Sequence, residues 1–543
     1  EATARFKLKA IEPLGEAKLH WTLKGEQGDF QIGESISIRP LTTNRVQLQT
    51  AVLDSAEKQL SLERKLFEPF SRKEAGLQSS PLVWAQGLSA YLDSYPHACT
   101  EQLVSKSVPA LILGKPQENL PAFNQLIAQL RSRQNSEGAF GLWAANPVVE
   151  PMVSLYVVDM LLDAKGNGYA VPQDMLERAN GYLSVLSSGP SSGLSELRQR
   201  AYGTYLLARQ GVQVSGALAD IRDRLQRYYP KDWQSDIASA WLAASFTLMQ
   251  QQTLAKPLWE AQTWELMQKT PKRFDLYLDP LVHDAQLLTL VARHAPERLE
   301  KLPEGLLERV GNWLSAQRYT SLSAGTLVRA LAAYDQQASS GELTLTAQVA
   351  DKWLLQTLPK AELPFTTDKV KVQKAGAADA FYMLMEAGFD KQPVAAFSHG
   401  LEVSRDYLDL KGEPLKGLKV GEEFLVRLRL RATSLEQLEQ VVVIDLLPGG
   451  VEPVYRDKGE EFSGWQPPIG VGERSDWSPS WLNVREDRVL LYGTASRDVG
   501  TFTYKARATN VGHFQVPAAY AEGLYDPLQQ ALGAGSELVI SAP

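Results

Sequence analysis

The residues best suited to chemistry in this sequence are a cysteine and a glutamine three positions apart. Cys99 is the only cysteine among 543 residues, and it lies in the stretch YPHACTEQ, which ends at Gln102. If a helix begins here, side chains three residues apart lie one turn apart on the same face. The thiol of Cys99 can then attack the side-chain carbonyl of Gln102, release ammonia and leave an internal thioester that closes over Thr100 and Glu101.

A thioester is a reactive group that needs protection. Its leaving group is a thiolate, so it acylates amines and hydroxyls and is slowly destroyed by water. The commonest fate of a free cysteine is instead that of a small buried apolar residue, and the spacing alone favours this inert alternative. Glu101 could position or deprotonate an attacking amine, but an exposed helix carboxylate is the simpler interpretation of it.

The elements that must position this pair change character along the chain. Residues 1–75 alternate apolar and polar positions between Gly, Pro and Asn breaks from the first ten residues onward, which predicts β-strands. From 76 to 358 the pattern is that of about a dozen helices without a heptad repeat, which predicts an α/α array or closed toroid. Residues 359–398 return to the strand pattern, and 399–543 predict a β-sandwich of about seven short strands.

The order of these segments predicts that one domain is inserted into another. We expect the helices to interrupt a β-domain whose two parts, 1–75 and 359–398, fold together. The predicted fold class is multidomain α + β, with an α/α toroid inserted in a split β-domain and a β-sandwich after it. The first residues lack an initiator Met and the apolar core of a signal peptide, so we expect the sequence to begin inside a larger protein.

The composition excludes several classes of function. Hydrophobic residues make up 44% and charged residues 22%, the balance of a globular protein. With 56 basic against 63 acidic residues and no basic run, we expect no nucleic-acid binding. No apolar stretch approaches the roughly 20 residues of a membrane span. The histidines form no metal-binding motif and no phosphate-binding loop occurs, so we expect neither a metal nor a cofactor.

The residues around Cys99 resemble a known family. YPHACTEQ is similar to the Cys-x-Glu-Gln thioester motif of the alpha-2-macroglobulin and complement superfamily, and its Tyr-Pro lead-in resembles the bacterial members. Ala98 stands where many relatives have Gly, and Leu524 where bacterial relatives often have Met. Three more stretches resemble family segments and follow in the family's order: GAFGLW (138–143), VVIDLLPGGVEP (442–453) and GHFQVPAAYAEGLYDP (512–527).

The resemblance implies a protease trap rather than a turnover enzyme. A protease would cut a bait region, the trap would rearrange, and a lysine amine of the protease would attack Gln102 once to form a covalent adduct. The partners would be target proteases, together with bait and macroglobulin-like regions that precede Glu1 in the same protein. The resemblance also implies a CUB-like split β-domain, a macroglobulin-like last domain, and a periplasmic lipoprotein held to the inner membrane by a lipid outside this sequence.

The thioester would need a dry cover, because a wall without polar partners leaves no place for water. By the resemblance, Tyr525 would pack over the bond with Leu524 beside it. Tyr95 and Trp84, close to Cys99 in the sequence, could complete the wall, although each is also suited to be an ordinary core aromatic. A cover supplied by another domain would open by domain separation.

A second nucleophile is conceivable at His283, in the stretch DPLVHDAQLL. In the complement branch of the superfamily, a helical histidine attacks the thioester first and passes the acyl group to hydroxyls. A neutral imidazole can act as both nucleophile and base near neutral pH. A histidine at a helix start is more often a surface or capping residue, so the sequence leaves the preference between amines and hydroxyls open.

The sequence also leaves three other functions to be weighed. GPSSG matches the Gly-x-Ser-x-Gly hydrolase elbow with Ser191 as nucleophile, but that elbow needs a preceding strand and a helix is predicted here. A carbohydrate-active α/α toroid with a β-sandwich would need paired carboxylates, for which Asp275, Asp279 and Asp284 are candidates. A structural or adhesive module without a thioester would keep Cys99 inert.

Overall fold

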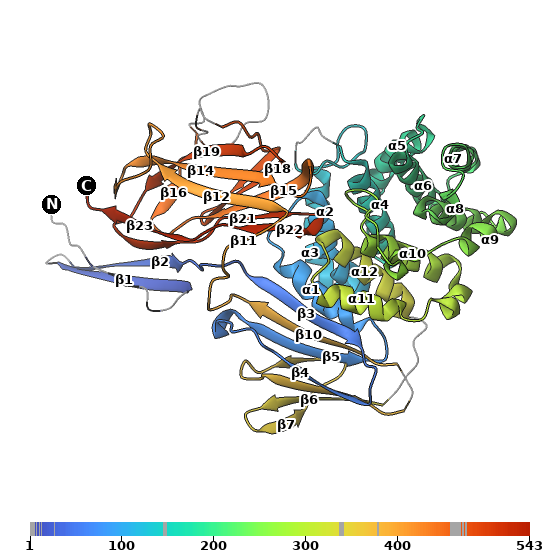
Figure 1. The fold of residues 1–543 in the computed structure, drawn as a ribbon, viewed down its shortest axis with the longest axis horizontal. Coiled ribbons are helices and arrows are strands. Elements are labelled where there is room, and N and C mark those ends of the chain that lie inside the picture. The colour runs from blue at the N-terminus through green and yellow to red at the C-terminus, as the bar shows by residue number, and fades with distance from the viewer. Residues whose placement is uncertain are drawn as a thin grey trace. The chain divides into compact units, whose positions relative to one another are not determined.

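The computed structural model combines helices and sheets (Figure 1). Apart from a few isolated positions, it describes residues 14–25, 28–144, 149–335, 342–376, 379–456 and 475–543. The chain divides into two compact units. The larger unit comprises Arg45–Arg64 and Glu68–Gly388, and the smaller comprises Glu1–Asn44, Lys65–Phe67 and Phe389–Pro543.

The helical part of the larger unit is a closed ring. Helices α2, α4, α6, α8, α10 and α12 each pack against the next, and α12 packs back against α2. These inner helices are buried on most sides, as their near-continuous apolar sequences require, whereas outer helices such as α7 expose a polar face. The helices are α1 Val83–Ser94, α2 Thr100–Leu113, α3 Pro116–Arg131, α4 Pro151–Gly166, α5 Gln173–Ser188, α6 Leu194–Ala208, α7 Ser215–Tyr228, α8 Ile237–Leu248, α9 Gln252–Glu260, α10 Pro280–His294, α11 Leu306–Ser315 and α12 Ser321–Asp335.

Strands from both sides of the helical segment form the β-part of this unit. Strand β10, which follows the helices, lies between β3 and β5, which precede them, in the sheet β3-β10-β5-β8. A second sheet has the order β4-β9-β6-β7, and leucines and valines from both sheets share one core. The strands are β3 Arg45–Val52, β4 Glu57–Ser61, β5 Arg72–Gln78, β6 Leu343–Val349, β7 Lys352–Leu355, β8 Lys360–Leu363, β9 Lys369–Lys374 and β10 Phe381–Gly388.

Two of the sequence-based boundaries of this unit are wrong. The last described helix, α12, ends at Asp335, and β6 and β7 lie in the interval to residue 358 that the sequence assigned to helices. The apolar alternation Leu343, Leu345, Ala347 has a period of two and pairs with β9, but this run is too short to stand out beside the long helices. The expected segment 359–398 also runs too far, because β10 ends at Gly388.

The smaller unit contains a hairpin and a β-sandwich. Strands β1 (Gly15–Gly25) and β2 (Gly28–Ile38) pair only with each other among the described strands, so they do not join the split β-domain as the range 1–75 predicted. Most of residues 1–13, where a first strand was expected, lie outside the described residues. After the hairpin, Arg39 donates to the carbonyls of Leu447 and Pro448 at 3.3 and 3.2 Å, which ties this segment to the sandwich.

The sandwich has more strands than the seven expected. Its sheets have the orders β11-β22-β21-β15-β18-β17, β12-β14-β19-β16 and β13-β23-β20. Alternate residues of β14 are buried, as the period of two requires, and they join one apolar core with β15, β18 and β19. The strands are β11 Phe397–His399, β12 Leu401–Leu408, β13 Leu418–Lys419, β14 Glu423–Ala432, β15 Gln437–Leu446, β16 Val451–Pro453, β17 Trp481–Val484, β18 Arg488–Ser496, β19 Gly500–Ala508, β20 Gly512–Val516, β21 Tyr520–Gly523, β22 Asp526–Leu532 and β23 Ser536–Ser541.

Among the helices that the structure describes, none is long and apolar enough to cross a membrane.

Candidate functional site

Cys99 and Gln102 form the first turn of helix α2. Cys99 is the N-cap residue, with extended backbone angles, and its side chain faces the backbone N–H of Gln102. The backbone N–H of Cys99 in turn donates to Oε1 of Gln102 over 2.9 Å. This reciprocal arrangement is a capping box, in which both side chains fold over the same turn. The sulfur and the carboxamide therefore lie side by side.

Both side chains of the pair are buried, and one polar atom has no partner. Cys99 and Gln102 are each 2% exposed. The amide nitrogen Nε2 of Gln102 has no hydrogen-bond partner in the part of the chain that the structure describes. Leaving such a group unpaired in the interior costs about 1–3 kcal/mol. It is the same nitrogen that would leave as ammonia if Cys99 attacked the carboxamide.

The backbone around Cys99 is held by the stretch 138–143. The backbone N–H of Thr100 donates to the carbonyl of Leu142 over 2.9 Å, and its hydroxyl donates to the same carbonyl over 3.0 Å. Gly138 has φ +89°, and a Cβ there would lie 2.0 Å from the carbonyl oxygen of Arg178. Glycine is therefore required where this stretch turns toward the cysteine.

Arg133 also anchors this turn. One terminal nitrogen, Nη2, donates to the carbonyl of Ala98 over 3.0 Å, and Nη1 donates to the hydroxyl of Thr100 and the carbonyl of Leu142, each over 3.1 Å. Burial lowers the pKa of this guanidinium, and negative charge on Cys99 acts in the opposite direction and raises the pKa. The guanidinium is therefore close enough to the sulfur of Cys99 to interact with a negative charge on it.

The structure corrects the expectation that Glu101 is an exposed helix carboxylate. Its side chain is buried, at 1% exposure, because α12 and α4 pack on this face of α2. Its carboxylate accepts hydrogen bonds from the hydroxyls of Ser105 at 2.5 Å and Ser321 at 2.8 Å. The Ser105 hydroxyl also lies 3.0 Å from that of Tyr156, whose pKa is raised first by burial and further by the charge of Glu101.

The two aromatic residues expected near Cys99 differ in their surroundings. Tyr95 is half-buried and contacts the rings of Tyr91 and His97 at centroid distances of 5.4 and 5.1 Å, immediately before the motif. Trp84 instead donates from its indole nitrogen to the carbonyl of Tyr382 over 3.0 Å, inside the core that α1 and α11 share with the sheet. Trp84 is therefore a core residue, and its part in the cover stays a prediction.

Leu524 and Tyr525, the other residues expected in the cover, belong to the smaller unit. They form the turn between β21 and β22, and each is 3% exposed. The backbone N–H of Leu524 donates to the carbonyl of Gln440 over 2.9 Å, which fixes the turn within the sandwich. Their role in covering the thioester stays a prediction.

His283 is neither a surface nor a capping residue. It is 2% exposed within α10, and Asp279 caps that helix by accepting from the backbone N–H of Val282 over 2.8 Å. The ring nitrogen Nδ1 lies 2.8 Å from Oδ1 of Asp284, and the ring stacks on Phe274 at 5.2 Å. These contacts orient the imidazole within the helical ring, and acyl transfer by His283 stays a prediction.

The carboxylates considered for a sugar cleft have structural partners. Asp284 is buried and accepts from the backbone N–H groups of Glu265 and Leu266 at 2.7 and 2.9 Å. Asp279 is the helix cap described above, and Asp275 accepts from the backbone N–H of Tyr277 over 3.0 Å. Ser191 lies three residues after the end of helix α5, without the preceding strand that a nucleophile elbow requires.

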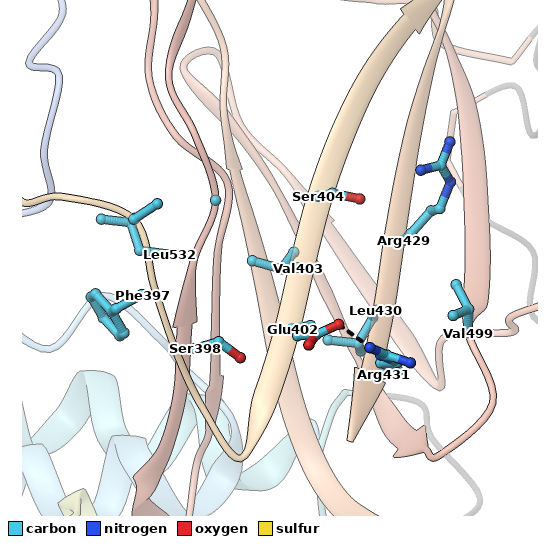
Figure 2. A pocket seen from close by; sticks show the side chains of 12 residues that line it. Phe397, Ser398, Glu402, Val403, Ser404, Arg429, Leu430, Arg431, Val499 and Leu532 are labelled. Carbon is cyan, nitrogen blue, oxygen red and sulfur yellow. Dashed lines mark hydrogen bonds and ion pairs between the residues drawn. The ribbon is translucent and has the colours of Figure 1, made fainter. Parts of the chain in front are cut away.

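A pocket of about 640 Å³ lies wholly within the sandwich of the smaller unit. Figure 2 shows Phe397, Val403 and Leu532 on its apolar side and the ion pair between Glu402 and Arg431 beside them. None of the residues predicted from the sequence lines it. Across the described ranges, no group of three or more His, Cys, Asp or Glu side chains is arranged to hold a metal ion.

Sequence reasoning missed three residues of the site. Arg133, Ser105 and Ser321 contact the motif, but nothing in their local patterns marks them. Arg131, two residues before Arg133, has the same side chain and instead pairs with Asp174 at an exposed position. Only the fold shows which of the two arginines turns toward Cys99.

Comparisons with known proteins agree with this architecture. Residues 400–527 match the family model of the bacterial alpha-2-macroglobulin MG10 domain. An alpha-2-macroglobulin homolog from Yersinia pestis is 35% identical over 582 aligned residues, which cover 100% of this chain but 29% of that protein. The chain thus spans less than a third of that relative's length.

Solved structures share the fold at lower sequence identity. Native Escherichia coli alpha-2-macroglobulin, from domain MG7 to the C-terminus, matches with a TM-score of 0.78 at 20% identity, covering 98% of this chain and 88% of that chain. Salmonella alpha-2-macroglobulin reacted with methylamine gives 0.78 at 21% identity, covering 98% of this chain and 36% of that chain.

These matches confirm the predicted fold class, a helical ring combined with several sheets. The chain belongs to the alpha-2-macroglobulin family.

Proposed function

We propose that this chain is the capturing part of a protease trap, with an internal thioester between Sγ of Cys99 and the side-chain carbonyl of Gln102. One observation carries the proposal: the two side chains fold over one buried turn, and the amide nitrogen that would leave has no partner among the described residues. Formation releases ammonia, with the thiol proton passing to the leaving nitrogen. The product no longer contains the unpaired amide.

Capture is a single acyl transfer. A lysine amine of the protease attacks the carbonyl carbon of Gln102, the carbon–sulfur bond breaks, and the proton lost by the amine ends on the thiol of Cys99. The products are an amide and a free thiol, and the thioester is not restored. The chain therefore acts once and is an inhibitor of proteases rather than a catalyst.

The remaining features of the trap follow from family membership. We propose that proteases are the covalent partners and that the bait region lies in a part of the protein outside this sequence. Periplasmic location with a lipid anchor is proposed on the same ground. Tyr525 and Leu524 are proposed as the cover that excludes water, because the GLYDP segment resembles the one that has this role in the family.

Incorporation of isotopically heavy methylamine tests the proposal. Methylamine is small enough to reach a buried carbonyl, and the Salmonella relative was studied after reaction with it. We expect one methylamine on Gln102 by peptide mapping and one new thiol on Cys99, in equal amounts. Cys99→Ala and Gln102→Glu, neither of which can form the bond, are the matched controls. A wild-type chain that takes up no methylamine and has a reactive thiol throughout would overturn the proposal.

A further inference from the structure

Arg133 occupies a special position relative to Cys99. Its guanidinium donates to the carbonyl of Ala98, directly before the cysteine, and to the hydroxyl of Thr100, directly after it. The residue follows α3, and its own carbonyl accepts from the backbone N–H of Gly141 over 3.0 Å. The guanidinium therefore spans the cysteine from one neighbouring residue to the other.

The charge of Arg133 is not neutralised by a carboxylate. Within the described part of the chain it forms no ion pair, and its Nε atom is buried without a hydrogen-bond partner. Its hydrogen-bond acceptors are two carbonyls and one hydroxyl, all uncharged. By contrast, Arg131 donates two hydrogen bonds to Asp174 at 2.8 and 2.9 Å. A partly buried cation without a counterion stabilises a negative charge that appears beside it more strongly than a cation in water does.

We propose that Arg133 stabilises the negative charge that develops on Sγ of Cys99, both when the thioester forms and when an amine opens it. In the forming reaction, the Cys99 thiol loses its proton and attacks the carboxamide of Gln102. In the opening reaction, the carbon–sulfur bond breaks and its electron pair stays on sulfur, before the proton from the amine reaches it. Arg133 gains and loses no proton in either step.

The effect should be visible in the free thiol. A cysteine has a pKa of about 8.5 when unperturbed, and neighbouring arginine, lysine or protonated histidine lowers it into the range of about 3.5–7.5. A leaving thiol of lower pKa departs faster. Arg133 would therefore make the thioester more reactive toward amines, in addition to holding its backbone.

The effect of Arg133 on the sulfur must be distinguished from the effects of other ionisable groups nearby. His97 is 4% exposed and precedes the motif, so it is the second group there that can carry positive charge. Glu101 is held on the α12 side by the hydroxyls of Ser105 and Ser321, and Tyr156 lies behind Ser105. A His97→Gln variant distinguishes the imidazole from the guanidinium.

The test uses the full chain and four variants: Arg133→Gln, Arg133→Lys, His97→Gln and, as the matched exposed control, Arg131→Gln. After complete opening with methylamine, the rate of Cys99 alkylation by iodoacetamide is followed as a function of pH, and the rate of opening is measured separately. We expect Arg133→Gln to raise the pH midpoint of Cys99 alkylation by one unit or more. The same change should slow opening by up to about tenfold, the limit for one pKa unit when the full charge develops on sulfur. Arg131→Gln should match the wild type.

Arg133→Lys separates charge from simple positioning. Lysine keeps the positive charge but lacks the fork that spans Ala98 and Thr100. If Arg133 only held the backbone, lysine and glutamine variants would behave alike, with the thiol midpoint unchanged in both. An unchanged midpoint in Arg133→Gln, or a shift produced by His97→Gln alone, would overturn the inference.

This inference rests on the proposed thioester, but the experiment can still decide on Arg133 if the thioester is absent. If the wild type takes up no methylamine, the proposed function is wrong. The alkylation profile of the Cys99 thiol, measured then on the untreated protein, still reports whether Arg133 lowers its pKa. If methylamine is taken up and Arg133→Gln leaves the midpoint and the opening rate unchanged, only the inference about Arg133 is wrong.

Discussion

Two buried polar regions of the helical ring differ in how their groups are paired. In the first, Asp163 on α4 accepts from three arginines: Nη2 of Arg209 at 2.8 Å, both terminal nitrogens of Arg293 at 2.9 and 2.8 Å, and Nε of Arg329 at 2.8 Å. In the second, the turn of Cys99 and Gln102, buried nitrogens of Gln102 and Arg133 have no hydrogen-bond partner among the described residues. Nη2 of Arg329 in the first region also lacks a hydrogen bond, but it forms ion pairs of 2.8 Å with both Asp159 and Asp163.

The difference in pairing distinguishes a group that stabilises the fold from groups that could take part in a reaction. Burial alone would raise the pKa of Asp163, but the three guanidinium groups outweigh it and hold the pKa well below its usual range. The carboxylate is thus fixed in one state and joins α4 to α10 and α12. At Cys99 the unpaired amide nitrogen of Gln102 is the one that would leave as ammonia, and the unpaired Arg133 nitrogen belongs to a cation beside the sulfur. Unsatisfied buried groups of this kind mark candidate functional sites.

The largest effect is expected from Asp163→Asn. The substitution keeps the shape of the side chain but leaves three arginines with one carboxylate fewer in the interior. Removing one member of a buried ionic group costs about 3–5 kcal/mol, so the free energy of unfolding in urea should fall by this amount. Asp174→Asn, which removes the exposed partner of Arg131, is the matched control and should change little. Equal effects at both sites would break the distinction drawn above.

A pH dependence should follow from His294, at the edge of the Asp163 region. Burial, followed by the charges of Arg293 and Arg209, lowers its pKa from 6.5 to about 4. The unfolded chain therefore binds a proton below pH 6.5 that the folded chain does not, so stability is present above this pH and is lost as the pH falls toward 4. At about 1.4 kcal/mol per unit, the loss reaches about 3 kcal/mol.

His294→Gln is the variant for this prediction. A glutamine can keep the hydrogen bond with the hydroxyl of Tyr205, 2.9 Å away, but it does not titrate. Unfolding free energies measured from pH 7.5 to 4 should therefore fall less steeply in the variant than in the wild type. If the free energies of unfolding of the two proteins fell in parallel with pH, the pKa of His294 would not be lowered in the folded chain.

A smaller loss of stability is expected from Ser321→Ala, which tests whether Glu101 is stabilised by its hydrogen bonds as Asp163 is by its arginines. Glu101 lies in the Cys99 motif but, like Asp163, it has a partner on another helix: Ser321 of α12, in addition to Ser105 of its own helix. Removing one of its two serine donors should lower the free energy of unfolding by about 1–2 kcal/mol. Ser188→Ala, on the exposed end of α5, should change little. If Ser321→Ala left the free energy of unfolding unchanged, the hydrogen bond from Ser321 would not stabilise the fold, and Glu101 would resemble the unpaired groups at Cys99 rather than Asp163.

The sequence correctly predicted that Cys99 and Gln102 share the first turn of a helix, and it correctly predicted the order of strand-rich and helical segments. A spacing of three residues at a helix start is a local property, and the capping box at Cys99 and Gln102 realises it directly. The apolar sequences of the inner helices likewise predict the helical ring. The boundary at 358 failed because β6 and β7 are short strands that follow long helices, and the boundary at 398 failed because β11 pairs with β22, which lies far away in the sequence.

The surroundings of the pair depend on tertiary contacts that no local pattern contains. Glu101 is buried because α12 brings Ser321 to it from 220 residues away. The indole nitrogen of Trp84 donates to the carbonyl of Tyr382, 298 residues later in the sequence. Arg133 is identical in type to Arg131, and only the fold gives the two arginines different partners.

The intact mass of freshly purified protein, measured before any reagent is added, tests the central claim most directly. If Cys99 and Gln102 are joined, the chain should be lighter than its sequence by one molecule of ammonia, and Cys99 should not react with a thiol reagent under denaturing conditions that preserve the bond. The Cys99→Ala chain should have its full sequence mass. A wild-type chain at full mass, with Gln102 still an amide and a free thiol at Cys99, would contradict the account.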